Sequence, residues 1–263
     1  MTEPLYVITT GEGPDLVMLH GWGMHSGVWQ TVAEQLGSSF RLHCVDLPGH
    51  GRSRDSEDVA SLTAWTERVA ETMSPRLAGQ AYWCGWSLGG MVATQLAWDY
   101  SKLVKRLILV ATSLRFCQVY DWPDAVAPDV LQGFAANLQD DHRQTLQRFL
   151  ALQVTGEPKA RQTLREHKQR VFDQDDPEAD ALQTGLNILS TADLRPLAGK
   201  LDLPVLLIGG AKDRLVSPRA LDNVAALLPD AKVEVMPDCG HAPFISQPEN
   251  FMKLVKTFCT HVD

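Results

Sequence analysis

Seven short apolar runs, rich in β-branched and aromatic residues, recur along this chain, and from the third onward helix-compatible segments separate them. The runs are "LYVITT", "DLVMLH", "RLHCVDL", "AYWCGW", "RLILVAT", "PVLLIGG" and "KVEVMP". The composition of segments 61–73 and 89–100 predicts two of the intervening helices. Because alternation of strand and helix is typical of a mostly parallel sheet covered on both faces, we expect an α/β fold.

The alternation stops after "RLILVAT", and about 90 residues pass before "PVLLIGG". This interval contains "DWPDAVAPDVLQGFAANL" and "TLQRFLALQ", whose apolar spacing predicts amphipathic helices. We expect residues 113–190 to form a helical cap, inserted into a core made of residues 1–112 and 191–263. Open α/β sheets bind ligands at the carboxyl ends of their strands, so the cap is expected to cover that edge.

The composition fits a single soluble domain: 263 residues are 44% hydrophobic and 21% charged. A formal net charge of −8 argues against a protein that coats nucleic acid or an anionic membrane. The N-terminal segment shows no signal-peptide pattern, and no apolar run has bilayer-spanning length. Five scattered cysteines form no CxxC pair, which predicts neither a disulfide framework nor a metal site. We therefore expect a cytoplasmic monomer.

The stretch "GWSLGG" at 85–90 places Ser87 between a predicted strand and a predicted helix. A reversal this tight strains the central residue, and the small neighbours Gly85 and Gly89 tolerate a close approach of the chain. Such a turn is a nucleophile elbow, which exposes the serine oxygen beside a helix N-terminus. The GxSxG pattern alone occurs by chance in roughly one chain of this length in ten, so the prediction depends on the flanking strand and helix.

A serine hydroxyl becomes a good nucleophile only when a base takes its proton and a carboxylate orients that base. Asp213 follows the predicted strand "PVLLIGG", and His241 follows the next one, "KVEVMP". Singly, each residue fits a turn or loop role as well as a catalytic one, but their joint order after Ser87 favours a triad. Asp238 is an alternative acid that we rank below Asp213, because it does not follow the earlier strand.

The stretch "LHGWG" at 19–23 follows the second predicted strand. Acyl transfer needs donors for the oxyanion, and we expect the backbone N–H groups of Trp22 and Leu88 to supply them. A plain Gly-rich turn is the alternative interpretation of "HGWG". The stretch "DLPGHGRS" at 46–53 lacks the spacing of a phosphate-binding loop and is interpreted as a turn after the third strand.

The chain resembles the α/β-hydrolases nearly end to end, through "LHGWG", "DLPGHGRS", "GWSLGG", "GAKDRLVSP" and "GHAPF". Within that superfamily it is similar to the esterases of biotin synthesis that act on the methyl ester of pimeloyl-acyl-carrier protein. This similarity lies in "LHGWGMHSGVW", "GWSLGGMVA", "DWP" with "PDVLQGF", "RFLALQ" and "HAPFISQP". The resemblance implies a serine esterase that needs neither cofactor nor metal and that releases methanol from the carrier-linked ester.

The resemblance also implies where the substrate lies, with its acyl chain under the cap. The implied substrate-binding residues are Trp22, Ser87, Leu88, Phe149, Leu150, Ala151, Leu152, Gln153 and His241. For Phe149, the pattern leaves open the alternative of a plain core residue in the cap.

The family binds its acidic carrier protein through basic residues of the cap, and residues 141–170 hold seven Arg or Lys against three acids. The implied docking residues are Arg143, Arg148, Arg161 and Arg165. Arg161 and Arg165 share one helical face with Lys168, although a solvated charged face has the same pattern. The chain departs from the family at Gln144, where the family has an arginine nearby.

Two other functions stay open at this point. A general short-chain carboxylesterase has the same triad and differs in its independence of a carrier. A non-catalytic binding protein on the same fold is the second alternative, and the complete set of serine, base and acid argues against it.

Overall fold

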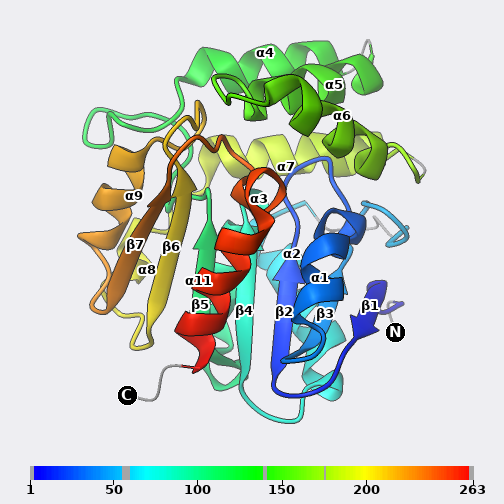
Figure 1. Cartoon of the computed structure of the whole chain (residues 1–263). Helices are drawn as coiled ribbons and strands as arrows, with labels where there is room; N and C mark the ends of the chain where they lie inside the picture. The colour runs from blue at the N-terminus through cyan, green and yellow to red at the C-terminus, as the bar shows by residue number, and fades with distance from the viewer. Residues whose placement is uncertain (1–2, 55–59, 139–140, 175, 261–263) are drawn as a thin grey trace.

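The computed structural model describes residues 3–54, 60–138, 141–174 and 176–260. Its centre is a seven-stranded sheet in the order β1-β3-β2-β4-β5-β6-β7 (Figure 1). The strands are β1 (Val7–Thr10), β2 (Asp15–Leu19), β3 (Arg41–Val45), β4 (Ala81–Trp86), β5 (Val104–Val110), β6 (Val205–Gly210) and β7 (Ala231–Met236). Only the pairing of β1 with β3 is antiparallel, and the other five pairs are parallel. Each of the seven predicted runs forms one strand, which confirms the expected α/β fold.

Helices cover both faces of this sheet. In Figure 1, α1 (Gln30–Leu36) and α11 (Pro248–Thr260) lie on the face toward the viewer. On the other face α2 (Leu62–Met73) packs against α3 (Leu88–Asp99). Other helices are α8 (Arg195–Ala198), α9 (Pro218–Ala225), α10 (Pro243–Ser246), η1 (Ser26–Trp29), η2 (Ser74–Arg76) and η3 (Ser101–Leu103). Strands β2, β4 and β6 are buried along their whole length, as expected of central strands between two helical layers.

Four helices follow β5 and lie over the carboxyl ends of the strands (Figure 1). They are α4 (Pro128–Leu138), α5 (His142–Gln153), α6 (Ala160–Val171) and α7 (Ala179–Thr191). We call these four helices and their connections the cap. The division of the chain at 113 and 190 stays a prediction, and α7 ends one residue beyond its second limit. Within the described residues, no helix has both the length and the apolar character needed to cross a membrane.

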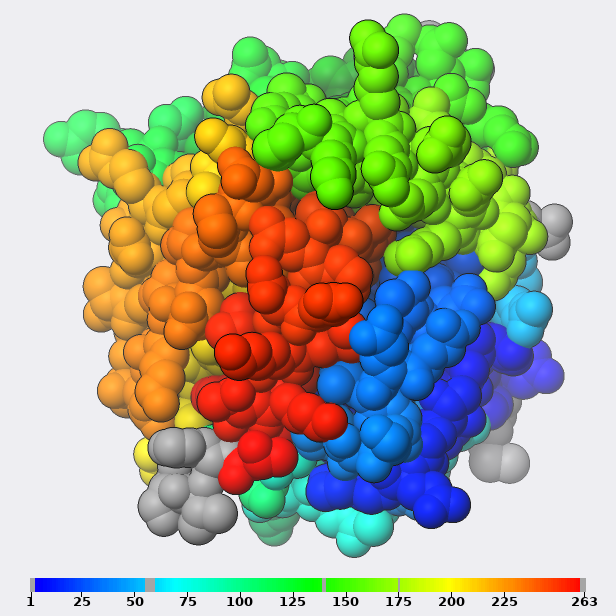
Figure 2. All heavy atoms as spheres, viewed as in Figure 1, coloured from blue at the N-terminus to red at the C-terminus, as the bar shows by residue number. Residues whose placement is uncertain are grey.

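The cap and the sheet share one hydrophobic core. Leu146 and Leu150 of α5 and Leu182 of α7 are fully buried in the same cluster as the side chains of β2 and β4. In the space-filling view the cap, coloured green, is seated directly on the orange and red segments of the C-terminal third (Figure 2). The cap is therefore packed onto the sheet edge where the sequence predicts the active site.

Candidate active site

Ser87 lies at the junction of β4 and α3 with a φ of 54° and a ψ of −119°, a conformation that costs a non-glycine residue free energy. Two neighbouring glycines make the turn sterically possible. A Cβ on Gly85 would lie 2.4 Å from the oxygen of Gly89, and a Cβ on Gly89 would lie 2.4 Å from the oxygen of His20. Within the turn, the N–H of Ser87 donates to the oxygen of Val110 at 2.9 Å. The sequence therefore encodes the predicted elbow.

The elbow differs from the sequence expectation in one respect, because the serine is not exposed. Ser87 has only 2% of its surface accessible. Cap helix α7 packs beside it, since a Cβ on Gly185 would lie 3.1 Å from the side chain of Leu88. The cap thus shields the nucleophile from bulk water.

His241 and Asp213 form a buried pair in the loops after β7 and β6. Nδ1 of His241 lies 2.8 Å from Oδ2 of Asp213, and both side chains are fully buried. Oδ1 of Asp213 accepts from the backbone N–H groups of Leu215 and Val216 at 2.8 and 3.0 Å. Because a hydrogen on Nδ1 satisfies the carboxylate, the lone pair of the neutral imidazole lies on Nε2. Nε2 is buried and has no hydrogen-bond partner among the described residues.

Trp86 connects this pair to the serine. Its indole Nε1 donates to the backbone oxygen of His241 at 2.8 Å, and Ser87 is the next residue in the chain. The alternative acid, Asp238, is exposed and adopts a φ of 61°, in the turn before His241. The structure thus brings Ser87, Asp213 and His241 to the same edge of the sheet and pairs the imidazole with Asp213.

The loop at 19–23 lies against the elbow. A Cβ on Gly21 would lie 3.3 Å from Cβ of Ser87, so the backbone of this loop borders the nucleophile. The N–H of Leu88 belongs to the first turn of α3, where intrahelical partners are missing. Within the described part of the chain, neither this N–H nor that of Trp22 donates a hydrogen bond. That these two N–H groups bind an oxyanion stays a prediction.

Two buried histidines, which sequence reasoning missed, fix that loop. His20 donates from Nδ1 to the oxygen of Gly21 at 2.8 Å and accepts at Nε2 from the N–H of Leu47. Likewise, Nε2 of His50 accepts from the N–H of Gly23 at 3.2 Å. Burial lowers the pKa of each histidine to about 3, so both are neutral and can accept these bonds. In the sequence, these histidines could have been recognised by their position beside the glycines of "LHGWG" and "GHGRS".

The predicted acyl side of the site is an aromatic cluster under the cap. The rings of Trp22 and Phe149 meet edge to face with centroids 5.0 Å apart, and Phe134 of α4 lies 5.4 Å from Phe149. Leu150 is buried, whereas Ala151 and Leu152 are half-buried. The side chain of Gln153 is buried, and both of its polar atoms are without a partner among the described residues. Phe149, Leu150 and Gln153 therefore turn toward the core. A substrate-binding role for the segment 149–153 stays a prediction.

Residues 14–248 match a protein family described as "alpha/beta hydrolase fold". The chain belongs to the α/β-hydrolase family. A protein of Nitrosomonas europaea named pimeloyl-[acyl-carrier protein] methyl ester esterase is 46% identical over 248 residues, which are 94% of this chain and 96% of that protein. A protein of Vibrio vulnificus with the same name is 40% identical over 258 residues, or 98% and 99% of the two chains. The chain belongs to the same family as these esterases, which confirms the resemblance found in the sequence.

The fold is also that of a solved esterase from Exiguobacterium antarcticum. The two structures align with a TM-score of 0.89 over 98% of this chain and 96% of the other, although only 21% of the residues are identical. At this identity the likeness concerns the fold alone.

The basic residues predicted to bind a carrier protein lie on α5 and α6. Arg143 pairs weakly with Asp176, at 3.5 Å, and covers the ring of Phe172. Arg148 donates to Oε1 of Gln144. Both residues are exposed, as are Arg161 and Arg165 of α6. All four arginines thus present charge on the outer surface of the cap.

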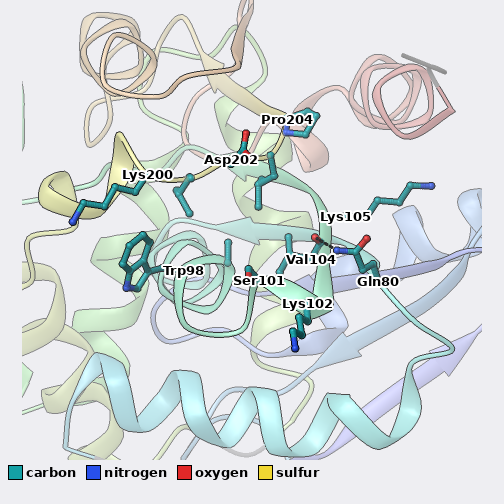
Figure 3. A pocket seen from close by; sticks show the side chains of 12 residues that line it. Gln80, Trp98, Ser101, Lys102, Val104, Lys105, Lys200, Asp202 and Pro204 are labelled. Carbon is teal, nitrogen blue, oxygen red and sulfur yellow. Dashed lines mark hydrogen bonds between the residues drawn. The ribbon is translucent and has the colours of Figure 1, made fainter.

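A surface pocket of about 550 Å³ lies far from this site, at the opposite edge of the sheet (Figure 3). It is lined by residues at the N-terminal ends of β5 and β6, among them Val104 and Pro204. Three lysines surround it, but Lys102, Lys105 and Lys200 point away from one another in Figure 3. Their charges do not converge, so this pocket is a poor anion site.

No group of three or more His, Cys, Asp and Glu side chains is placed to hold a metal ion in the part of the chain that the structure describes. That the reaction needs neither metal nor cofactor stays a prediction.

Proposed function

We propose that this protein is a serine esterase that hydrolyses the methyl ester of pimeloyl-acyl-carrier protein to the free acid and methanol. The observation that carries the proposal is the buried pair of His241 and Asp213, with a free Nε2, at the sheet edge where Ser87 forms a strained elbow. The proposed substrate is inferred from the relatives, which are named as esterases of this carrier-linked methyl ester.

In the proposed reaction, Oγ of Ser87 attacks the ester carbonyl while Nε2 of His241 takes the hydroxyl proton. The N–H groups of Trp22 and Leu88 stabilise the negative charge on the tetrahedral intermediate. The imidazolium then gives its proton to the departing methanol, and the acyl group remains on Ser87. A water molecule, deprotonated by His241, attacks the acyl-enzyme and releases the acid. Asp213 holds the imidazole in the required tautomer and stabilises its positive form.

The proposed acyl site is the aromatic cluster of Trp22, Phe134 and Phe149 together with residues 150–153, of which Leu150 and Gln153 are buried. A pimeloyl chain has an apolar middle, and burial of methylene groups against such a surface stabilises the complex by about 0.8 kcal/mol for each group. On the outer surface of the cap, the proposed carrier docking site is the exposed set Arg143, Arg148, Arg161 and Arg165. Positive charge there complements an acidic carrier and speeds its encounter with the enzyme.

The test is incubation of the protein with methyl pimeloyl-acyl-carrier protein and measurement of the free acid by mass spectrometry. The control substrate is a short nitrophenyl ester without a carrier. We expect kcat/KM to be higher for the carrier-linked ester. Equal or better turnover of the small ester would favour a general carboxylesterase instead. Inertness toward both esters and toward a fluorophosphonate probe would favour a non-catalytic binding protein.

A further inference from the structure

Glu157 is a buried carboxylate of the cap, in the turn between α5 and α6, with 7% of its surface exposed. Its Oε1 accepts two hydrogen bonds, from the backbone N–H of Gly240 at 2.6 Å and from Oγ of Ser246 at 2.7 Å. Both distances are at the short end of the usual range of hydrogen bonds. Glu157 is thus bound firmly to a segment more than 80 residues away in the chain.

The two donors flank His241. Gly240 directly precedes it, and Ser246 ends the short helix α10 that follows it. The backbone N–H of His241 itself donates to the oxygen of Gln153, the last residue of α5, at 2.8 Å. The cap therefore holds the loop of the histidine at three points, and Figure 2 shows the green cap seated on the orange-red segment after β7.

There is little space for this loop to shift toward the cap. A Cβ on Gly240 would lie 2.1 Å from the oxygen of Gln153 and 3.0 Å from Oε1 of Glu157. Away from the cap, the oxygen of His241 accepts from the indole of Trp86. The backbone of His241 is therefore held between β4 and the cap, and the carboxylate of Glu157 makes two of the hydrogen bonds on the cap side.

We propose that Glu157 is a positioning residue for the catalytic base, so that the cap determines the position of His241 relative to Ser87. The inference rests on the proposed function, in which Nε2 of His241 moves a proton between Oγ of Ser87 and the departing alcohol. Such a transfer needs heavy atoms within hydrogen-bond distance, and a displacement of about 1 Å can cost about 100-fold in rate. Glu157 does not touch the reacting atoms and acts through the backbone of Gly240.

The experiment compares four variants with the parent on a short nitrophenyl ester, which does not need the carrier docking site. Glu157→Ala removes both hydrogen bonds and should lower kcat about 100-fold with KM unchanged. Glu157→Gln keeps an acceptor oxygen and should recover much of that loss. Ser246→Ala removes one donor and should have the smallest effect. The matched control is Glu166→Gln, because Glu166 is another carboxylate of the cap whose Oε1 accepts only from Gln162 in the described structure.

A second measurement does not need turnover. The hydrogen between Nδ1 of His241 and Asp213 should give a downfield proton NMR signal, which we expect to shift or broaden in Glu157→Ala and to stay unchanged in Glu166→Gln. A purely structural Glu157 would lower the melting temperature but leave both kcat and this signal unaltered, and that result would overturn the proposal. If Glu157→Ala does not fold, the same two readouts on Glu157→Gln and Ser246→Ala decide.

These readouts also separate the two proposals. If the parent does not hydrolyse the carrier-linked ester but Glu157→Ala changes the NMR signal, the proposed substrate is contradicted and the positioning role is supported. Efficient turnover of that ester, with no change in any Glu157 or Ser246 variant, would do the reverse.

Discussion

The indole Nε1 of Trp22 donates a hydrogen bond to the backbone oxygen of Leu182, 2.8 Å away on cap helix α7. The loop that is proposed to bind the oxyanion is therefore fixed to the cap as well as to the sheet. One turn further along α7, Gly185 leaves room for this contact. A Cβ at that position would lie 2.5 Å from Cδ1 of Trp22 and 3.1 Å from the side chain of Leu88.

Replacement of Gly185 by Ala should therefore disturb both proposed oxyanion donors at once. We expect kcat to fall by about 10- to 100-fold, because a shift of less than 1 Å in a donor weakens its bond to the transition state. The control is Gly133→Ala on cap helix α4, where an added Cβ meets no atom within 4 Å. That change should leave kcat unchanged and stabilise the protein by about 0.5–1 kcal/mol, as alanine does in a helix interior. Equal kcat in the two variants would contradict the packing argument.

Ser87→Ala should reduce ester hydrolysis by about a million-fold, as loss of a triad nucleophile does in other serine hydrolases. Circular dichroism and the melting temperature should stay close to those of the parent, since alanine removes only a hydroxyl group. Activity within tenfold of the parent would show that another residue is the nucleophile.

The two candidate acids should differ sharply on conversion to asparagine. Asp213→Asn should lower kcat by about 10⁴-fold, because an amide at that position favours the wrong tautomer of His241. Asp238→Asn should have little effect, since Asp238 is exposed and asparagine tolerates its φ of 61°. Comparison of kcat for the two variants checks the assignment, and the reverse order of losses would make Asp238 the acid.

The strands, the elbow and the acid–base pair could be predicted from the sequence because each depends on local pattern. Central strands buried on both faces appear as continuous apolar runs, and Asp213 follows one of them, β6. His241 follows the edge strand β7, which appears as an alternation of apolar and charged residues. Glu157 could not be found in this way, because its partners Gly240 and Ser246 lie 83 and 89 residues further along the chain. The bond from Trp22 to Leu182 spans 160 residues and has no local signal either. Sequence pattern therefore indicated which residues come together at this edge of the sheet, but not what holds them in place.

The stability of the protein should fall as the pH drops below 6.5. Burial lowers the pKa of His20, His50 and His167 to about 3. Between pH 3 and 6.5 the unfolded chain binds a proton at each histidine and the folded protein does not, so protonation favours unfolding. This stability is fully present above pH 6.5 and is lost as the pH falls, by about 1.4 kcal/mol per histidine at pH 5.5.

His167→Leu tests this linkage by urea unfolding at pH 7 and pH 5.5. Both ring nitrogens of His167 are buried without a partner among the described residues, so leucine should not destabilise the protein at pH 7. From pH 7 to pH 5.5, the free energy of unfolding of His167→Leu should therefore fall less than that of the parent, by a difference of about 1.4 kcal/mol. Gly133→Ala, which changes no titratable group and adds a Cβ that meets no atom within 4 Å, should leave the parent's pH dependence unchanged. An unaltered pH dependence in His167→Leu would show that His167 is protonated equally in the folded and unfolded states.

The proposed carrier docking site predicts a defect that depends on the substrate. Replacement of Arg148, Arg161 and Arg165 by Ala should raise KM for the carrier-linked ester by about tenfold, since exposed ion pairs contribute about 0.2–1 kcal/mol each. The small nitrophenyl ester should react as before, because these side chains lie on the outer surface of the cap. The defect should shrink as salt is added, since charges are screened beyond about 10 Å at 0.1 M ionic strength.

A matched control removes the same number of charges elsewhere. Lys102, Lys105 and Lys200 surround the pocket at the opposite edge of the sheet, so their replacement by Ala changes the net charge equally without altering the cap (Figure 3). If both triple variants raise KM for the carrier-linked ester alike, the effect comes from overall charge and not from docking at the arginines. Equal losses on both esters in the arginine variant would show that these residues support the fold. Specific docking predicts that only the arginine variant raises KM for the carrier-linked ester while KM for the small nitrophenyl ester stays unchanged.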